Sequence, residues 1–258
     1  MLTTMTIREE KLSYYIDRLR RKDYFSLPGY GDSEWLSITG TNIGSYSGLG
    51  QLHSEKIGAM LRKTLRTPDP TYLRATAKII QTLPVWDNIQ KYIREHHEAD
   101  GDYYERDMIT DDLAAAGGLY PLIEQLRKMH VVLIGNPSLE NIDFLNVQKF
   151  IPISTPNFYE EMYGIKWVVR EILEYNQPAV YIFSAGMSAA VMIRELHGKI
   201  QGSFFLDLGS MFDAFTGAGA QRQWRRDLYT HPELYEVWLK KCLHDIPSKA
   251  YENINKYV

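Results

Sequence analysis

Cysteine is nearly absent from the 258-residue chain, and Cys242 is its single example. One cysteine excludes an internal disulfide and a zinc site built from several cysteines, and it is typical of a reducing compartment. No segment approaches the roughly 18 consecutive apolar residues that a membrane-spanning helix needs. The N-terminal stretch MLTTMTIREEKLSYY carries early acidic residues and no apolar signal-peptide core. We therefore expect a cytoplasmic protein without a membrane span.

The sequence also lacks a dominant charge. Lysine and arginine together number 29 against 32 aspartates and glutamates, which gives a net charge of −3. There is thus no overall basic field to attract nucleic acid or anionic lipid. Apolar residues make up 45% of the chain, enough for a sizeable core. The length fits one large α/β domain or two small ones.

Four apolar runs in the second half of the chain end in small or polar residues. VVLIG at 131–135 and AVYIFSAG at 179–186 are continuous and rich in β-branched residues, as in buried parallel strands. FIPIS at 150–154 and GSFFLDLGS at 202–210 complete the set, and helical patterns separate the four. This alternation predicts an α/β fold, with a Rossmann-like parallel sheet and flanking helices.

Helical spacing of apolar residues dominates the rest of the chain. We interpret residues 1–258 as a single domain, with a largely helical insertion at about 50–128 and a helical C-terminal segment at about 211–258. An apolar and aromatic face in that segment is either a face for a homodimer or part of the core. The helices predicted elsewhere span 5–21, 52–65, 71–83, 85–98 and about 104–128, and the residues of the C-terminal face are Tyr229, Tyr235, Trp238, Leu239 and Leu243.

The loops after the four predicted strands are candidate ligand contacts. In parallel sheets, ligands bind outside the carboxyl ends of the strands. A helix directly follows Ser184-Ala185-Gly186, so its first N–H groups are suited to a phosphate. The alternative is that strand-to-helix turns favour glycine and serine in any case. The predicted binding residues in these loops are Gly135, Asn136, Ser184, Gly186, Gly209 and Ser210, and the loop at 154–157 belongs to the same edge.

Two short basic clusters are candidate phosphate contacts. QRQWRRD at 221–227 brings Arg222, Arg225 and Arg226 close together, and arginine groups of this kind bind diphosphates or form surface ion pairs. RLRRK at 18–22 is either a phosphate contact or the solvated end of a helix. We select Arg222 as the candidate for the diphosphate.

The stretch SLPGYGDSEWLSITG, at 26–40, contains the best candidate for a metal site. It reads as a strand that ends in a tight turn, with Asp32 and Glu34 just beyond. In an extended or turning segment, residues two apart point to the same side, so both carboxylates would aim at one point. Such a pair suits Mg²⁺ or Mn²⁺ when substrate phosphates complete the shell, and Gly29 and Gly31 would allow close backbone approach. Solvated loop carboxylates or helix caps are the alternative.

Several of these pieces, in this order, resemble motifs of the GT-D-fold glycosyltransferases. GYGDSEW resembles the N-terminal GDGE motif of that family, and VVLIGNPSL resembles its central strand and loop. IFSAGMSAAVMIREL, followed by FFLDLGSMFDAF and an arginine-rich turn, resembles its C-terminal stretch. The chain departs from the family pattern at three positions. Ser33 stands for the second glycine, Gly29 for an arginine that often precedes the motif, and Asn136 for a Gly-Pro.

The resemblance implies a sugar transfer from a nucleotide sugar, with Mn²⁺ or Mg²⁺ held by Asp32 and Glu34. It also implies that the strand-end loops line the donor pocket. An inverting transfer needs a carboxylate base near the acceptor hydroxyl, and Asp207 and Asp213 are the candidates.

We therefore expect a metal-dependent glycosyltransferase that uses a UDP-type donor and a hydroxyl acceptor. The acceptor is a glycan, a small molecule or a modified nucleic-acid base. One alternative is a DNA-modifying glycosyltransferase acting on a hydroxymethylated base, for which the arginine clusters would contact phosphates. A second alternative is a nucleotide- or sugar-binding module without catalysis.

Overall fold

The computed structural model describes residues 5–45, 50–66, 69–99, 101–106, 109–153, 157–160, 164–217 and 222–256. In these parts the chain forms two parallel sheets, one of five strands in the order β2-β9-β8-β6-β7 and one of four in the order β1-β5-β4-β3. The expected α/β class with a parallel sheet is confirmed. The strands are β1 (Met5–Arg8), β2 (Ser26–Leu27), β3 (Gly29–Tyr30), β4 (Ala75–Thr76), β5 (Gly101–Glu105), β6 (Val131–Gly135), β7 (Val147–Pro152), β8 (Val180–Ser184) and β9 (Phe204–Asp207).

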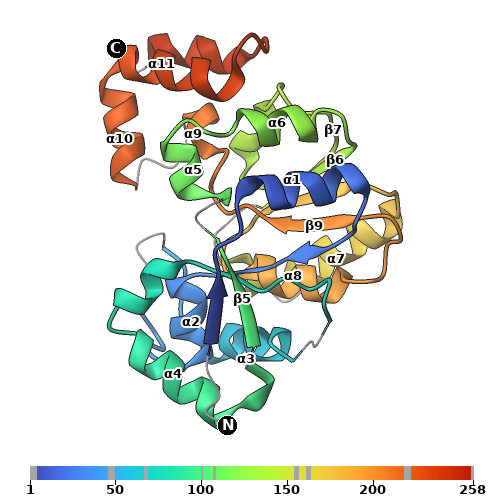
Figure 1. The fold of residues 1–258 in the computed structure, drawn as a ribbon, viewed down its shortest axis with the longest axis vertical. Coiled ribbons are helices and arrows are strands. Elements are labelled where there is room, and N and C mark those ends of the chain that lie inside the picture. Colours follow the sequence, from blue (N-terminus) through green and yellow to red (C-terminus); the bar gives the residue numbers. More distant parts are fainter. Residues whose placement is uncertain are drawn as a thin grey trace.

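Helices surround both sheets (Figure 1). The four-stranded sheet lies with α2, α3 and α4 in the lower part of the view, and the C-terminal helices α10 and α11 lie at the top. The α-helices are α1 (Leu12–Arg21), α2 (Asp32–Ile38), α3 (Glu55–Thr64), α4 (Trp86–Glu95), α5 (Asp111–Ala115), α6 (Tyr120–Leu126), α7 (Gly164–Tyr175), α8 (Ser188–Leu196), α9 (Asp213–Thr216), α10 (Gln223–Thr230) and α11 (Pro232–Leu243). The 3₁₀ helices are η1 (Lys78–Thr82), η2 (His97–Ala99), η4 (Pro137–Asn141), η5 (Phe158–Glu160) and η6 (Lys249–Lys256).

The five-stranded sheet is buried on both faces, which explains its continuous apolar runs. In β6, Val131 and Leu133 belong to one core cluster, together with α1 and α6 residues. Val132 and Ile134 belong to the other, together with α7 and α8 residues. Successive side chains of a strand point to opposite faces, so a strand covered on both sides needs apolar residues at every position. The four strands predicted in this half of the chain are all present.

The four-stranded sheet is the largest departure from the predicted elements. The helix predicted from residue 5 begins only at Leu12, because Met5–Arg8 form β1. The helix predicted over 71–83 is also wrong, since this stretch holds β4 and the 3₁₀ helix η1. Strands this short show no clear alternation of apolar and polar residues, and their place depends on distant partners such as β1 on β5. The insertion predicted at about 50–128 is helical for much of its length but carries β4 and β5.

The aromatic face at the C-terminus is part of the core. Its five residues are at most 8% exposed within the single chain. The ring nitrogen of Trp238 donates to the Ala114 carbonyl at 2.6 Å, and the Tyr235 hydroxyl donates to the Ala214 carbonyl at 2.9 Å. Of the two interpretations of this face, the structure supports core packing rather than a dimer contact. No helix in the described ranges has both the length and the apolar character that crossing a membrane requires.

Candidate active site

The chain crosses from one sheet to the other between residues 26 and 30. β2 pairs with β9 of the five-stranded sheet, and β3 pairs with β4 of the four-stranded sheet. Pro28, which has no N–H to give to a sheet, separates the two strands. α2 begins at Asp32, immediately after this crossing. The stretch from Gly29 to Glu34 therefore lies where the carboxyl ends of strands from both sheets meet.

A cavity of about 340 Å³, which we call the junction cavity, opens at this meeting point. Polar residues from five separate segments line one part of it. The 3₁₀ helix η1 and its neighbours provide an apolar wall. The polar lining side chains are Asp32, Arg106, Thr110, Asp112, Ser210 and Arg222, and the apolar wall consists of Ala77, Ile79, Ile80 and Leu83. Predicted binding residues Gly31, Gly209, Ser210 and Arg222 all reach this cavity.

Asp207 ends β9 and ties the two sheets together beneath the cavity. Its Oδ2 accepts a hydrogen bond from the Gly29 N–H at 3.1 Å, and its Oδ1 accepts one from the Gly209 N–H at 3.0 Å. The side chain of Arg106 forms an ion pair with it, with Nη2 3.6 Å from Oδ1. Asp207 is only 2% exposed, and burial raises its pKa, while Arg106 and the two N–H groups oppose that rise. Both oxygens are thus engaged in positioning the glycine turns.

Arg106 fills the space that the neighbouring glycines leave open. A Cβ atom added to Gly29 would lie 2.8 Å from the Arg106 Cζ, and one added to Gly209 would lie 2.7 Å from its Nη2. Gly209 also has a φ of +55°, which favours glycine. Position 29 is where the resembling family often carries an arginine. Here a guanidinium reaches the same place from the end of β5.

Asp32 and Glu34 do not share a side in the way predicted. They lie in the first turn of α2 rather than in an extended segment, and residues two apart on a helix are about 200° apart around its axis. Asp32 is exposed and lines the junction cavity. The Glu34 side chain folds back, and its Oε2 accepts a hydrogen bond from the Gly31 N–H at 2.8 Å. Glu34 thus caps the start of α2 through one of its oxygens.

Glu34 is a buried carboxyl in a crowded electrostatic environment. Burial is the main cause that raises its pKa to about 7. The positive charge of Arg106 opposes this rise, whereas the negative charges of Asp207 and Asp32 add to it. Its folded-state pKa thus lies above the ordinary 4.5. The protonated form contributes stability that is complete below about pH 4.5 and is lost as the pH rises through about 7.

This shift predicts a pH-dependent effect of Glu34→Gln on stability. A neutral amide cannot lose a proton. The variant should therefore not show the loss of stability that ionisation of Glu34 causes in the wild type between about pH 4.5 and 8. A rise of roughly 2.5 pKa units corresponds to about 3 kcal/mol. Without divalent metal, the variant should gain about that much in relative unfolding free energy from pH 5 to pH 8, as measured by urea denaturation. Exposed Glu95→Gln is the control, and an identical pH dependence of Glu34→Gln and wild type would contradict the assignment.

The chemistry of this site fits a divalent cation. Glu34 Oε2 accepts the Gly31 N–H, and the negative charge of Asp32 acts on the same carboxyl group. Asp32 and Asp207 place negative charge near the Glu34 carboxyl group. Arg106 is the one positive charge among the groups that shift its pKa. Two carboxylates with substrate phosphates are a typical shell for Mg²⁺. Within the described ranges, no group of three or more His, Cys, Asp or Glu side chains is arranged as a metal site.

The predicted contacts on β6 and β8 lie beside each other, and they are not among the residues that line the junction cavity. A Cβ on Gly135 would lie 3.0 Å from the Ser184 Cβ, because β6 and β8 are neighbours in register. The Asn136 side chain accepts a hydrogen bond from the Ser138 N–H and caps η4. Gly186 has a φ of +52° and lies against Gln51. The order of the strands reverses between β6 and β8, and ligands of such sheets bind at this point. Of the fourth loop, residues 154–156 lie outside the described residues.

The arginine group at 222–226 divides into separate roles. Arg225 is 1% exposed, and its Nη2 donates to both the backbone and the hydroxyl oxygen of Ser210 at 2.7 Å. It also pairs with Asp213, at 3.4 Å. Asp213 thus lies against Arg225 and is not among the residues that line the cavity. Arg226 donates to Gln223, and Arg222 alone of the three reaches the cavity.

The basic run at 18–22 also has partners inside the chain. Arg18 lies over the ring of Phe25 and donates to the Tyr14 hydroxyl. Arg20 and Arg21 form ion pairs with Asp17 and Asp23. This run belongs to the end of α1, and the structure supports the interpretation of a solvated helix terminus.

Sequence reasoning missed Arg106, Thr110, Asp112 and the apolar wall of η1. They lie in two stretches predicted to be helical, 71–83 and about 104–128, without a motif or a glycine-rich turn to mark them. The end of β5 places Arg106 at the cavity, and β5 itself was not foreseen. The usable signal was the departure at Gly29, where the resembling family often carries an arginine.

Three solved chains match this fold. One is "A New Glycosyltransferase (DUF1792) from Streptococcus sanguinis", with a TM-score of 0.58, 12% identity, and coverage of 80% of this chain and 82% of that one. The others are a selenomethionine structure of domain of unknown function 1792 and "The highly conserved domain of unknown function 1792 has a distinct glycosyltransferase fold". Each of these two has a TM-score of 0.55, 15% identity and coverage of 80% and 79%. No protein-family model and no curated protein sequence matches the chain. The chain thus has this glycosyltransferase fold.

Proposed function

We propose that this protein is a metal-dependent glycosyltransferase that moves a sugar from a nucleotide-diphosphate sugar, of the UDP type, to a hydroxyl acceptor. The observation that carries the proposal is the arrangement at the junction cavity. There Asp32 and Arg106, of opposite charge, line a cavity of about 340 Å³ at the carboxyl ends of parallel strands. The fold likeness to glycosyltransferase structures supports the same reaction class.

Within this proposal, Arg106 and Arg222 bind the donor diphosphate. Both line the cavity, and a guanidinium matches phosphate oxygens in charge and geometry. Asp32 and Glu34 would hold Mn²⁺ or Mg²⁺, which when bound supplies positive charge to the leaving diphosphate. Gly209 and Ser210 line the same cavity. The ends of β6 and β8 would extend the donor site through Gly135, Asn136, Ser184 and Gly186.

The catalytic base was expected at Asp207 or Asp213. Asp207 is occupied by two N–H groups and Arg106, and Asp213 by Arg225. Asp32 and Asp112 are the carboxylates that line the cavity, and Asp112 is exposed. With Asp32 at the metal, we assign the base to Asp112, and Asp207 and Asp213 to positioning.

This assignment predicts that Asp112→Asn lowers kcat by about 10²- to 10⁴-fold, the usual contribution of a general base. Donor binding should change little, because the side chain acts on the acceptor hydroxyl. The measurement is kcat and donor KM, with Asp87→Asn, an exposed aspartate in the first turn of α4, as the matched control. If Asp112→Asn keeps at least half of the wild-type kcat, the base lies elsewhere.

The function is tested by release of nucleoside diphosphate from a panel of nucleotide sugars, with and without Mn²⁺, and with candidate hydroxyl acceptors. Turnover of one donor that requires metal supports the proposal. Donor binding without turnover under any condition would favour the binding module. Duplex DNA with hydroxymethylated bases belongs in the acceptor panel, and transfer to it alone would select the DNA-modifying alternative.

A further inference from the structure

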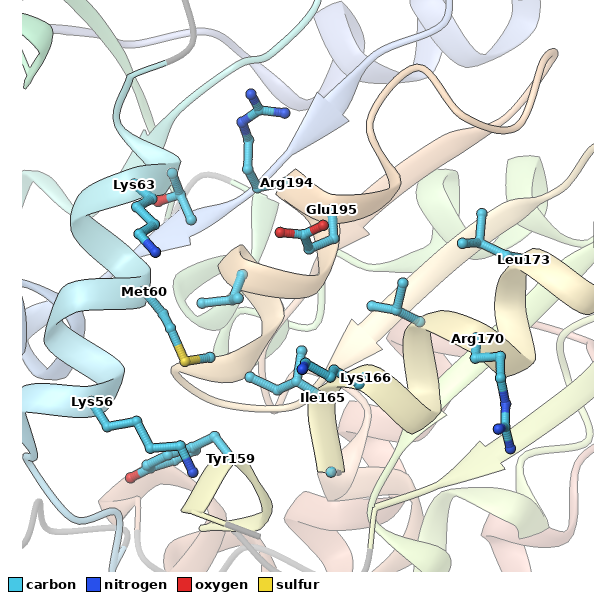
Figure 2. A pocket seen from close by; sticks show the side chains of 14 residues that line it. Lys56, Met60, Lys63, Tyr159, Ile165, Lys166, Arg170, Leu173, Arg194 and Glu195 are labelled. Atoms are coloured by element: carbon cyan, nitrogen blue, oxygen red, sulfur yellow. The ribbon is translucent and has the colours of Figure 1, made fainter. Parts of the chain in front are cut away.

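A second cavity, larger than the junction cavity, lies away from it. It has a volume of about 530 Å³ and opens between α3, α7 and α8 (Figure 2). It shares no lining residue with the junction cavity. We call it the helix pocket. Its volume lies in the range of small-molecule sites, about 300–1,000 Å³.

The floor of the helix pocket is apolar. Met60 reaches into it from α3, and Ile165 and Leu173 face it from α7 (Figure 2). Val169 of α7 and Val191 of α8 also line it. Ile165 and Val191 are 8% and 6% exposed. An aliphatic group placed here would therefore be removed from water on several sides.

The rim of the pocket is cationic. Lys56 and Lys63 come from α3, Lys166 and Arg170 from α7, and Arg194 from α8, whereas Glu195 is the only acidic residue in the lining. Glu195 lies 3.7 Å from Lys199, outside the pocket lining. Arg170 forms an ion pair with Glu174, with Nε 3.5 Å from Oε1. In the described part of the chain, no acidic side chain lies within ion-pair distance of the other four, Lys56, Lys63, Lys166 and Arg194. The pocket thus combines an apolar floor with positive charge that the chain itself does not neutralise.

We infer that the helix pocket binds an amphiphilic anion, a single aliphatic chain that ends in a phosphate or carboxylate head. The apolar floor fits the chain, and the four unpaired cations fit the head. A flat anionic membrane fits less well, because the apolar side chains line a concavity. On α7 only Trp167, which is 39% exposed, is a large exposed apolar residue. This inference does not depend on the proposed function.

Dodecyl phosphate, kept below its critical micelle concentration, is the probe, and calorimetric titration is the measurement. We expect saturable one-to-one binding and weaker binding of octyl phosphate, by up to about fourfold for each methylene lost. Lys63→Glu combined with Lys166→Glu should weaken binding at least tenfold. Lys11→Glu combined with Lys91→Glu, two exposed lysines outside the pocket, is the charge-matched control and should change it less than twofold.

A second variant tests the floor of the pocket without changing its charge. Val169→Trp fills the volume and should also weaken binding at least tenfold, while circular dichroism confirms the fold. Equal binding by the two double variants, or no dependence on chain length, would overturn the inference. Competition by inorganic phosphate alone would reduce the site to a simple anion site. Binding only to vesicles of anionic phospholipid, and not to monomeric dodecyl phosphate, would show a membrane-docking surface instead.

Discussion

Asp32→Asn should lower metal-dependent sugar transfer by about 10³-fold while leaving the fold intact. The residue is exposed and makes no hydrogen bond to the rest of the described chain, so its loss should cost little stability. In the proposed site it holds the divalent cation, and loss of a metal ligand removes several kcal/mol of transition-state stabilisation. The measurement is kcat/KM for the preferred nucleotide sugar across a series of Mn²⁺ concentrations.

Asp87→Asn provides the matched control for this result. Asp87 also lies exposed in the first turn of a helix, so both substitutions remove the same favourable interaction with a helix dipole. Asp87→Asn should keep the wild-type rate. Full metal-dependent turnover of Asp32→Asn would remove Asp32 from the metal site and the main support for the mechanism.

Asp207→Ala should destabilise the protein by about 3–5 kcal/mol. The substitution leaves the N–H groups of Gly29 and Gly209 without their acceptor, and it removes the carboxylate of the ion pair with Arg106. Breaking a buried ion pair by removing one partner is costly because the other charge stays buried. Urea denaturation at pH 7 measures the loss.

Two further variants separate the causes of this destabilisation. Asp23→Ala breaks an exposed ion pair with Arg21 and should cost less than about 1 kcal/mol. Asp207→Ala combined with Arg106→Met should recover part of the loss, because no unpaired charge remains. A cost below about 1 kcal/mol for Asp207→Ala alone would show that this carboxylate does not hold the sheets together.

The five-stranded sheet was predictable because its signal is local. VVLIG and AVYIFSAG must be strands covered on both faces, since neither helix periodicity nor alternation fits them. The four-stranded sheet was not predictable for the opposite reason. β3 and β4 have two residues each, and pairing between segments far apart in the sequence defines them.

The same contrast applies to the candidate site. Gly31, Asp32, Gly209, Ser210 and Arg222 were found because glycine turns and charged residues at strand ends are readable in the sequence, and they line one cavity. The direction of the Glu34 side chain could not be predicted from the sequence. The prediction assumed an extended turn, in which residues 32 and 34 point to the same side, but α2 begins at Asp32 and turns them to different sides. Arg106 was missed because its position depends on the unforeseen strand β5.

The central claim is that the junction cavity binds a nucleoside diphosphate through Arg106 and a cation at Asp32 and Glu34. The most direct test is calorimetric titration with a panel of nucleoside diphosphates, with and without Mn²⁺, on the wild type and on Asp32→Asn. We predict that one diphosphate binds, that binding requires Mn²⁺, and that Asp32→Asn abolishes the metal-dependent part. Metal-independent binding of equal affinity in both proteins, or no binding of any nucleotide, would contradict the claim.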